Sequence, residues 1–194
     1  MSFDRAIFFS AVRMPLFGGT LSQTQVDGMT AILDEWDAVL PGGDPRWLSY
    51  SLATIYRECG VAMYPVREWG LGRGRTYGDI DPTTGFAYYG RGYPQLTWKT
   101  NYAKMGAIIG VDLVHNPDKM LDPHISAQVM IIGMRDGIFT GKKLADYFNA
   151  DVNDPVDARR IINGLDHAYE VAGTYNHFLA AIDAATPLKS QVTT

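Results

Sequence analysis

The stretch YYGRGYPQLTW, from Tyr88 to Trp98, combines glycine, aromatic and amide side chains within eleven positions. It overlaps the end of a longer segment, Val61 to Gly92, which is rich in Gly, Pro and aromatic residues and has little helical periodicity. We expect this segment to form long loops with at most a short hairpin. Long loops inside a compact domain are usually functional, so a binding or catalytic site is predicted here.

Two carboxylates, Glu58 and Glu68, come before this stretch. A glycoside-cleaving site needs such a pair, because one acid protonates the departing sugar oxygen while the other activates water or attacks carbon. Glu58 lies one turn beyond Ile55, at the edge of an apolar helix stripe, where partial shielding would raise its pKa and keep its proton available. Glu68 lies in a loop and suits an ionised base; Asp79 and Asp81 compete for that role, but the DPTTG run at 81–85 is typical of a turn. From spacing alone, either glutamate could equally be a surface residue in an ion pair.

The composition is that of an ordinary globular domain of 194 residues, 46% of them hydrophobic. We expect one domain over residues 1–185, followed by a flexible polar tail over 186–194. A net charge of −4 argues against a general nucleic-acid-binding protein. The apolar run from Ala6 to Val12 is too short for a membrane span and lacks the features of a signal peptide. The single Cys59 is expected to be a small buried hydrophobe, as in a protein made in a reducing cytoplasm.

Charge is distributed unevenly along the chain. Between Arg57 and Lys104 there are seven basic residues and four acidic ones. Such an excess is common on solvated surfaces, but it would also suit a cationic groove for an anionic polymer such as peptidoglycan.

Helical periodicity predicts a mainly α fold. The clearest helix follows Leu21, because Ser22 and Gln25 can form a capping box there. A second helix is expected to begin at Pro45 with Asp44 as its cap. Further helices are predicted over 98–109, 123–135, 142–148, 155–162 and 166–184.

The segment from Tyr88 to Thr97 resembles the signature of family 19 glycoside hydrolases, in which Tyr-Tyr-Gly-Arg-Gly is followed by two residues and then Gln-Leu-Ser/Thr. Asn101 follows at the family's spacing, the block at 110–118 is similar to its next motif, and RIING at 160–164 resembles its substrate-binding element. The resemblance extends over residues 52–164. It is closest to the small endolysins of phages and prophages, on the segments 21–28, 65–68 and 139–144.

This resemblance implies a lysozyme-like, two-lobed single domain that hydrolyses β-1,4 glycosidic bonds of peptidoglycan without a cofactor. Glu58 would be the proton donor, Glu68 the general base, and Thr97 the hydroxyl that holds the attacking water. Substrate contacts would come from Tyr88, Arg91, Tyr93, Gln95, Asn101 and Asn163. Members of the family invert the anomeric centre, which implies that the two carboxyl groups are roughly 6.5 to 9.5 Å apart.

The chain also departs from the family pattern. The acid usually sits in His-Glu-Thr but here follows Arg57 and precedes Cys59, and the Asn-Gly-Gly element is Asn163-Gly164-Leu165. These departures argue against a plant-like extended chitin cleft but not against the carboxylate pair. A chitinase acting on N-acetylglucosamine polymers is the alternative enzyme, and a non-catalytic wall-binding or virion protein is the alternative from another class. We expect a monomer, made in the bacterial host cytoplasm and released to the wall with the help of a holin. No metal site is expected, because the four histidines lack paired ligand spacing: His115, His124, His167 and His177.

Overall fold

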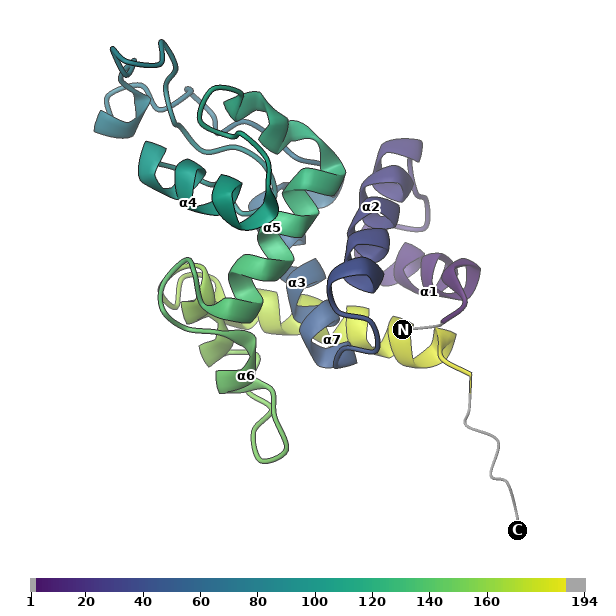
Figure 1. The fold of residues 1–194 in the computed structure, drawn as a ribbon. Helices are drawn as coiled ribbons and strands as arrows, with labels where there is room; N and C mark the ends of the chain where they lie inside the picture. The colour runs from purple at the N-terminus through teal and green to yellow at the C-terminus, as the bar shows by residue number, and fades with distance from the viewer. Residues whose placement is uncertain (1–2, 188–194) are drawn as a thin grey trace.

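The computed structural model describes residues 3–187 and is built mainly from helices (Figure 1). The α-helices are α1 (Arg5–Phe17), α2 (Gln23–Val39), α3 (Pro45–Glu58), α4 (Lys99–Ile109), α5 (Pro123–Asp136), α6 (Leu144–Tyr147) and α7 (Ala168–Ala185). Short 3-10 helices are η1 (Gly60–Ala62), η2 (Thr76–Gly78), η3 (Pro117–Leu121) and η4 (Asp157–Ile161). Within the described range no strand forms, and the chain makes only isolated antiparallel bridges, including Arg67 with Arg91. The predicted mainly α fold is confirmed.

Local capping signals set the starts of the main helices. Ser22 and Gln25 form the predicted capping box at α2, with the Ser22 amide donating to Gln25 Oε1 at 2.7 Å and the Gln25 amide to Ser22 Oγ at 3.2 Å. Asp44 caps α3, accepting from the Arg46 amide, and Pro45 occupies the first turn. Both predictions are confirmed, because they depend only on neighbouring residues.

Three parts of the chain differ from the prediction. The helix expected over 155–162 is only the 3-10 helix η4, because the Asp154 side chain accepts the amides of Val156 and Asp157 and the turn ends before Asn163. The segment 142–148 contributes only the short helix α6. The N-terminal apolar run, for which no helix was predicted, belongs to α1, which is capped by Asp4.

The predicted tail falls partly outside the described residues, since positions 188–194 are not described. Between residues 3 and 187, no helix has the length and apolarity that crossing a membrane would require.

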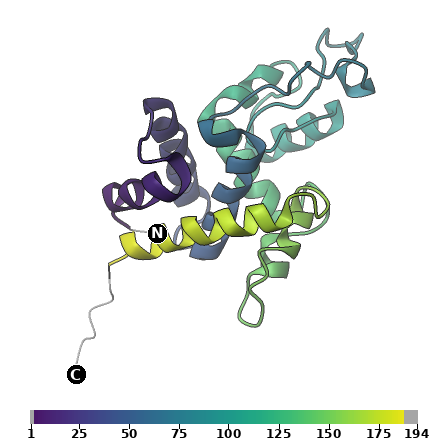
Figure 2. The same ribbon diagram turned by 180° about the vertical axis from the view of Figure 1, so that it is seen from behind.

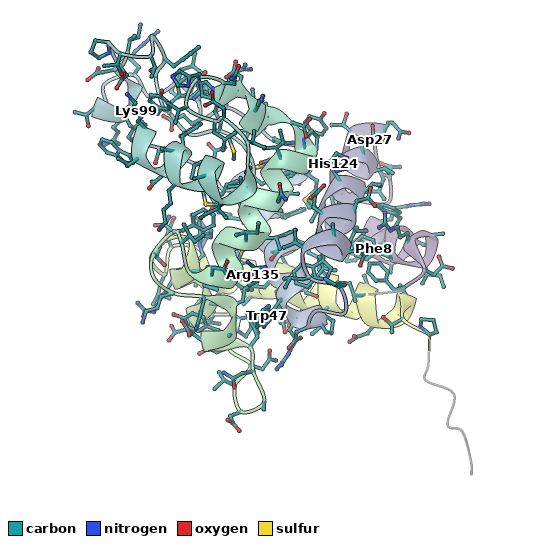
Figure 3. The ribbon with its side chains drawn as sticks, viewed as in Figure 1. Phe8, Asp27, Trp47, Lys99, His124 and Arg135 are labelled. Carbon is teal, nitrogen blue, oxygen red and sulfur yellow. The ribbon has the colours of Figure 1, made fainter. Side chains whose placement is uncertain are left out.

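The apolar core divides into two clusters, and α5 contributes to both. Met130 and Ile131 belong to the larger cluster with α1, α2, α3 and α7, whereas Val129 and Ile132 belong to the smaller one, which also contains Tyr88 and residues of α4. Figures 1 and 2 show α4 and the loops around it at one end of the molecule and α1 at the other. Figure 3 places Lys99 and Phe8 at these opposite ends. The predicted two-lobed arrangement stays a prediction.

Candidate functional site

Glu68 is fixed in place by reciprocal hydrogen bonds with Gly90. Its amide donates to the Gly90 carbonyl at 2.8 Å, and the Gly90 amide donates to Glu68 Oε2 at 2.9 Å. A charge-assisted bond of this kind suits an ionised carboxylate. The loop acid is therefore held against the signature segment by the backbone of that segment.

The absence of a side chain at Gly90 lets two predicted site residues meet. A Cβ atom at this position would lie 2.7 Å from Glu68 Oε2 and 3.0 Å from Gln95 Oε1. Glu68 Oε2 and Gln95 Oε1 therefore both lie in the space that a side chain at Gly90 would fill. This close approach gives a physical reason for glycine at the centre of the signature.

Glu58 is the last residue of α3, and its side chain is 20% exposed. It lies against Arg159, whose side chain is 3% exposed, with Glu58 Oε1 and Arg159 Nη1 2.7 Å apart. The two atoms form an ion pair without the alignment of a hydrogen bond, and neither has a hydrogen-bond partner among residues 3–187. Partial shielding of Glu58 was predicted correctly. The expected apolar surroundings of the Glu58 carboxyl are not found, because the buried guanidinium of Arg159 lies beside it.

Arg159 is the residue that sequence reasoning missed. Its Nε donates to the Asp166 carbonyl at 3.0 Å, which holds the guanidinium in place. Arg57 and Arg67, the basic residues nearest in sequence to the two glutamates, pair elsewhere, with Glu170 and Asp118. The only sequence signal for Arg159 is its place just before the RIING element, which does not indicate its partner.

The carbonyl of Gly92 connects the end of α3 to the signature loop. It accepts from Cys59 Sγ at 3.6 Å and from Gln95 Nε2 at 2.8 Å, while the Gly92 amide donates to the Val66 carbonyl. Cys59 follows Glu58 directly, and Val66 lies two positions before Glu68. The chain segments that carry the two acids are therefore bound to the same short loop. Cys59 itself is buried, which raises its pKa to about 12, so its thiol is not a candidate nucleophile.

A pocket of about 150 Å³ adjoins this loop and is lined by three of the predicted site residues. They are Gln95, Thr97 and Asn101, and the Asn101 side-chain amide donates to the Thr97 carbonyl at 2.9 Å. Part of the wall is apolar, from Phe139 and Ile162. Amides and a hydroxyl beside an apolar wall suit an acetamido group, which has a polar amide and a methyl. Asn163 follows Ile162 and is exposed, with its Oδ1 accepting from the Gly164 amide.

Two of the predicted substrate contacts, Tyr88 and Tyr93, do not fit the structure. Tyr93 is fully buried, and its hydroxyl donates towards the carbonyls of Gly28 and Met63. Tyr88 is buried in the smaller core cluster and packs edge-on against Tyr102. Neither ring offers a face to a saccharide, because core packing already covers both.

Arg91 was also predicted to bind substrate, and the structure gives it a structural role instead. Its side chain is buried, its Nε lies 2.7 Å from Asp118 Oδ1, and its guanidinium stacks 3.6 Å from the centre of the Tyr89 ring. It also donates to the Ala87 carbonyl. A guanidinium with this set of partners braces the loop and has little capacity left for a ligand.

Acidic partners neutralise much of the predicted cationic groove. Asp118 pairs with both Arg67 and Arg91, and Asp81 pairs with Lys99. Exposed basic residues remain at Arg73 and Arg75. The local positive charge is therefore smaller than the sequence count indicates.

Unusual backbone conformations gather at the candidate site. Gln95 and Trp98 have φ angles of +50° and +71°, which non-glycine residues rarely adopt. They flank Thr97, one of the predicted catalytic residues. Strain of this kind costs about 1–3 kcal/mol per residue and is concentrated at functional sites.

The chain is similar to chitinases both in sequence and in structure. Residues 75–134 match the family described as Chitinase class I. Endochitinase CH25 of Brassica napus is 47% identical over 95 residues, which are 48% of this chain and 26% of that protein. Chitinase 2 of Oryza sativa subsp. japonica is 31% identical over 121 residues, covering 58% of this chain and 32% of that protein. The chain thus spans less than a third of the length of these relatives.

Solved structures show the same fold over almost the whole chain. Chitinase C from Streptomyces griseus HUT6037 superposes with a TM-score of 0.65 at 23% identity, covering 96% of this chain and 79% of that one. A family GH19 class IV chitinase from Zea mays superposes with a TM-score of 0.61 at 16% identity, covering 93% of each chain. At such low identity these matches establish the fold alone.

Proposed function

We propose, because the chain belongs to the family 19 glycoside hydrolases, that it hydrolyses the β-1,4 bonds of N-acetylglucosamine polymers of the chitin type. The observation that carries this proposal is the convergence of Glu68 and Gln95 over Gly90, beside the pocket that Gln95, Thr97 and Asn101 line. The sequence motifs favoured peptidoglycan as the substrate, with chitin as the alternative. Because the relatives named above are chitinases, we now place chitin first.

In the proposed reaction the two glutamates divide the work. Glu58 gives a proton to the departing sugar oxygen, while Glu68 accepts a proton from the water that attacks the anomeric carbon. The Gly90 amide holds the Glu68 carboxylate in one orientation. Thr97 holds the water, and the Gln95 amide oxygen and the Asn101 amide hold the acetamido groups, because the Gln95 Nε2 hydrogens are already donated to the Val66 and Gly92 carbonyls.

Arg159 acts through Glu58, so we assign it as a positioning residue. The guanidinium, itself held by the Asp166 carbonyl, fixes the Glu58 carboxyl at the end of α3. A carboxyl in one fixed orientation can meet the leaving oxygen without reorganising, which is how positioning lowers a barrier.

Replacing the two acids tests the assignment. We expect Glu58→Gln to abolish the release of new reducing ends from soluble N-acetylglucosamine oligomers, and Glu68→Gln to lower it by about a hundredfold or more, the range that general acid–base catalysis supplies. The same exchange at Glu35, which lies on α2 and pairs with His124, is the matched control and should leave turnover unchanged. Circular dichroism shows whether each variant is folded. Near-full activity of folded Glu58→Gln protein would rule out its role as the acid.

The stereochemistry of the product tests the route. Attack by water held by Glu68 releases the inverted anomer, whereas a covalent intermediate would give retention. Proton NMR of the first product formed distinguishes the two.

Peptidoglycan is the second candidate substrate, because Arg73 and Arg75 are exposed on the loop that follows Glu68 and could meet its anionic peptides. Purified sacculi and chitin oligomers, assayed side by side, decide between the substrates. Binding of sacculi without new reducing ends would instead favour a non-catalytic wall-binding protein. If peptidoglycan is the substrate, we propose release of the chain from the cytoplasm with the help of a holin.

A further inference from the structure

Trp69 is fully exposed, at 100% of its reference surface. The other tryptophans are packed to different extents: Trp36 is buried, the Trp47 indole donates to the Phe148 carbonyl, and Trp98 is 47% exposed with its ring packed edge-on against Tyr77. A complete indole in water is unusual, because this side chain buries about 150–250 Å² when it finds a partner. Its exposure therefore calls for an explanation.

The backbone that carries Trp69 is well braced. Glu68 before it is bound to Gly90 in both directions, and the Leu71 amide after it donates to the Glu68 carbonyl at 3.2 Å. Further along the loop, a Cβ atom at Gly78 would lie only 2.0 Å from the Gly72 carbonyl oxygen, so the two backbone segments touch. The indole thus stands on a fixed turn next to a predicted catalytic acid.

We propose that the Trp69 indole is a stacking platform for a sugar ring of the substrate, close to the bond that Glu68 acts on. This inference rests on the proposed function, because it takes its ligand from that reaction. A pyranose ring has an apolar face of C–H groups that an aromatic face can cover, and the indole N–H remains free to donate to a hydroxyl. Trp69 would then supply the aromatic surface that Tyr88 and Tyr93, being buried, do not.

Its position next to Glu68 favours a saccharide over other occupants. Trp69 follows directly after Glu68, whose carboxylate accepts the Gly90 amide, so its backbone belongs to the loop that carries the proposed base. A neutral sugar ring can stack on the Trp69 indole without a charged side chain beside it. A second copy of the chain is the competing occupant, and the test below separates it.

The test measures binding of a soluble N-acetylglucosamine oligomer by calorimetry in the Glu58→Gln background, in which the ligand is not cleaved. We expect Trp69→Ala to weaken the Kd by about tenfold, the change that loss of a stacking contact of about 1.4 kcal/mol produces. Trp69→Phe keeps an aromatic face and should recover most of the affinity. Met14→Ala removes an exposed apolar side chain from α1, far along the chain, and should leave the Kd unchanged.

The emission of tryptophan gives a second readout. Covering an exposed indole shifts its fluorescence to shorter wavelength, so the oligomer should shift the emission of the Glu58→Gln protein more than that of the Trp69→Phe variant in the same background, which keeps the half-exposed Trp98. Unchanged affinity and an unchanged shift in the Trp69 variants would overturn the inference while leaving the proposed function standing. Failure of the parent protein both to bind and to cleave the oligomer would overturn the two together. Self-association that disappears in Trp69→Ala would assign the indole to a contact between chains and also overturn the sugar platform.

Discussion

At the scale of single residues, the candidate site depends on a missing side chain as much as on those present. Gly90 allows Glu68 and Gln95 to converge, and the two nearest atoms that a Cβ would meet are the side-chain oxygens of these residues, with Glu68 Cβ next at 3.2 Å. An alanine could be accommodated by moving them. The cost of the substitution should therefore fall on catalysis and not on folding.

We expect Gly90→Ala to lower kcat/KM by at least about tenfold, which corresponds to about 1.4 kcal/mol of transition-state stabilisation. The melting temperature should change little. Gly173→Ala is the matched control, because a Cβ at this helical position meets no atom within 4 Å, and its activity should equal that of the parent. A Gly90→Ala enzyme that is fully active would show that displacing Glu68 and Gln95 does not matter.

At the scale of elements, Asp118 of η3 ties the loops of the site together. It accepts from Arg67 at 2.8 Å and from the buried Arg91 at 2.7 Å, and so connects the loop of Glu68 to the signature segment. Partial burial alone would raise the pKa of Asp118, but the bonds from Arg67 and Arg91 outweigh this effect and hold the pKa below its usual value.

A lowered pKa in the folded state fixes the sign of the pH dependence. The stabilisation from Asp118 is present above the usual Asp pKa of about 3.9 and is lost as the pH falls below it through the folded value. We expect Asp118→Asn to lower the free energy of unfolding at neutral pH by about 1 kcal/mol, because the Asp118 side chain is 58% exposed and water screens its pairs with Arg67 and Arg91. Urea unfolding should show this difference from the parent shrinking in acid. The exposed Asp151, changed to Asn, should show no such difference, and a pH-independent effect at Asp118 would contradict the assignment.

At the scale of the whole molecule, α5 joins the two core clusters. Ile131 packs in the larger cluster and Val129 in the smaller one, and both side chains are fully buried on the same helix. A helix that belongs to two cores couples their unfolding, because neither cluster can lose its contacts with α5 without disturbing the other.

We expect one cooperative unfolding transition, reported equally by far-UV and near-UV circular dichroism. Ile131→Ala should lower the free energy of unfolding by about 2–5 kcal/mol, the cost of removing such a buried side chain, while the transition stays single. Val129→Ala, on the side of the smaller cluster, should also shift the midpoint without splitting it. Two separate transitions in either variant would show that the clusters unfold independently.

The sequence by itself determined those features that depend on residues a few positions apart. The capping box of Ser22 and Gln25, the Asp44-Pro45 helix start and the loop character of the signature region all follow from local chemistry, and the structure has all three. The family resemblance added the residues of the pocket, of which Gln95, Thr97 and Asn101 do lie together.

Only the tertiary structure decided which side chains are covered and which charges meet. The sequence predicts Tyr88, Tyr93 and Arg91 as substrate contacts. In the structure, packing buries both tyrosines, and Asp118 and Tyr89 enclose Arg91. Glu58 meets Arg159 only when η4 folds back onto the end of α3. Capping acts within one helical turn, whereas burial and ion pairing depend on residues far apart in the chain, whose positions no local pattern specifies.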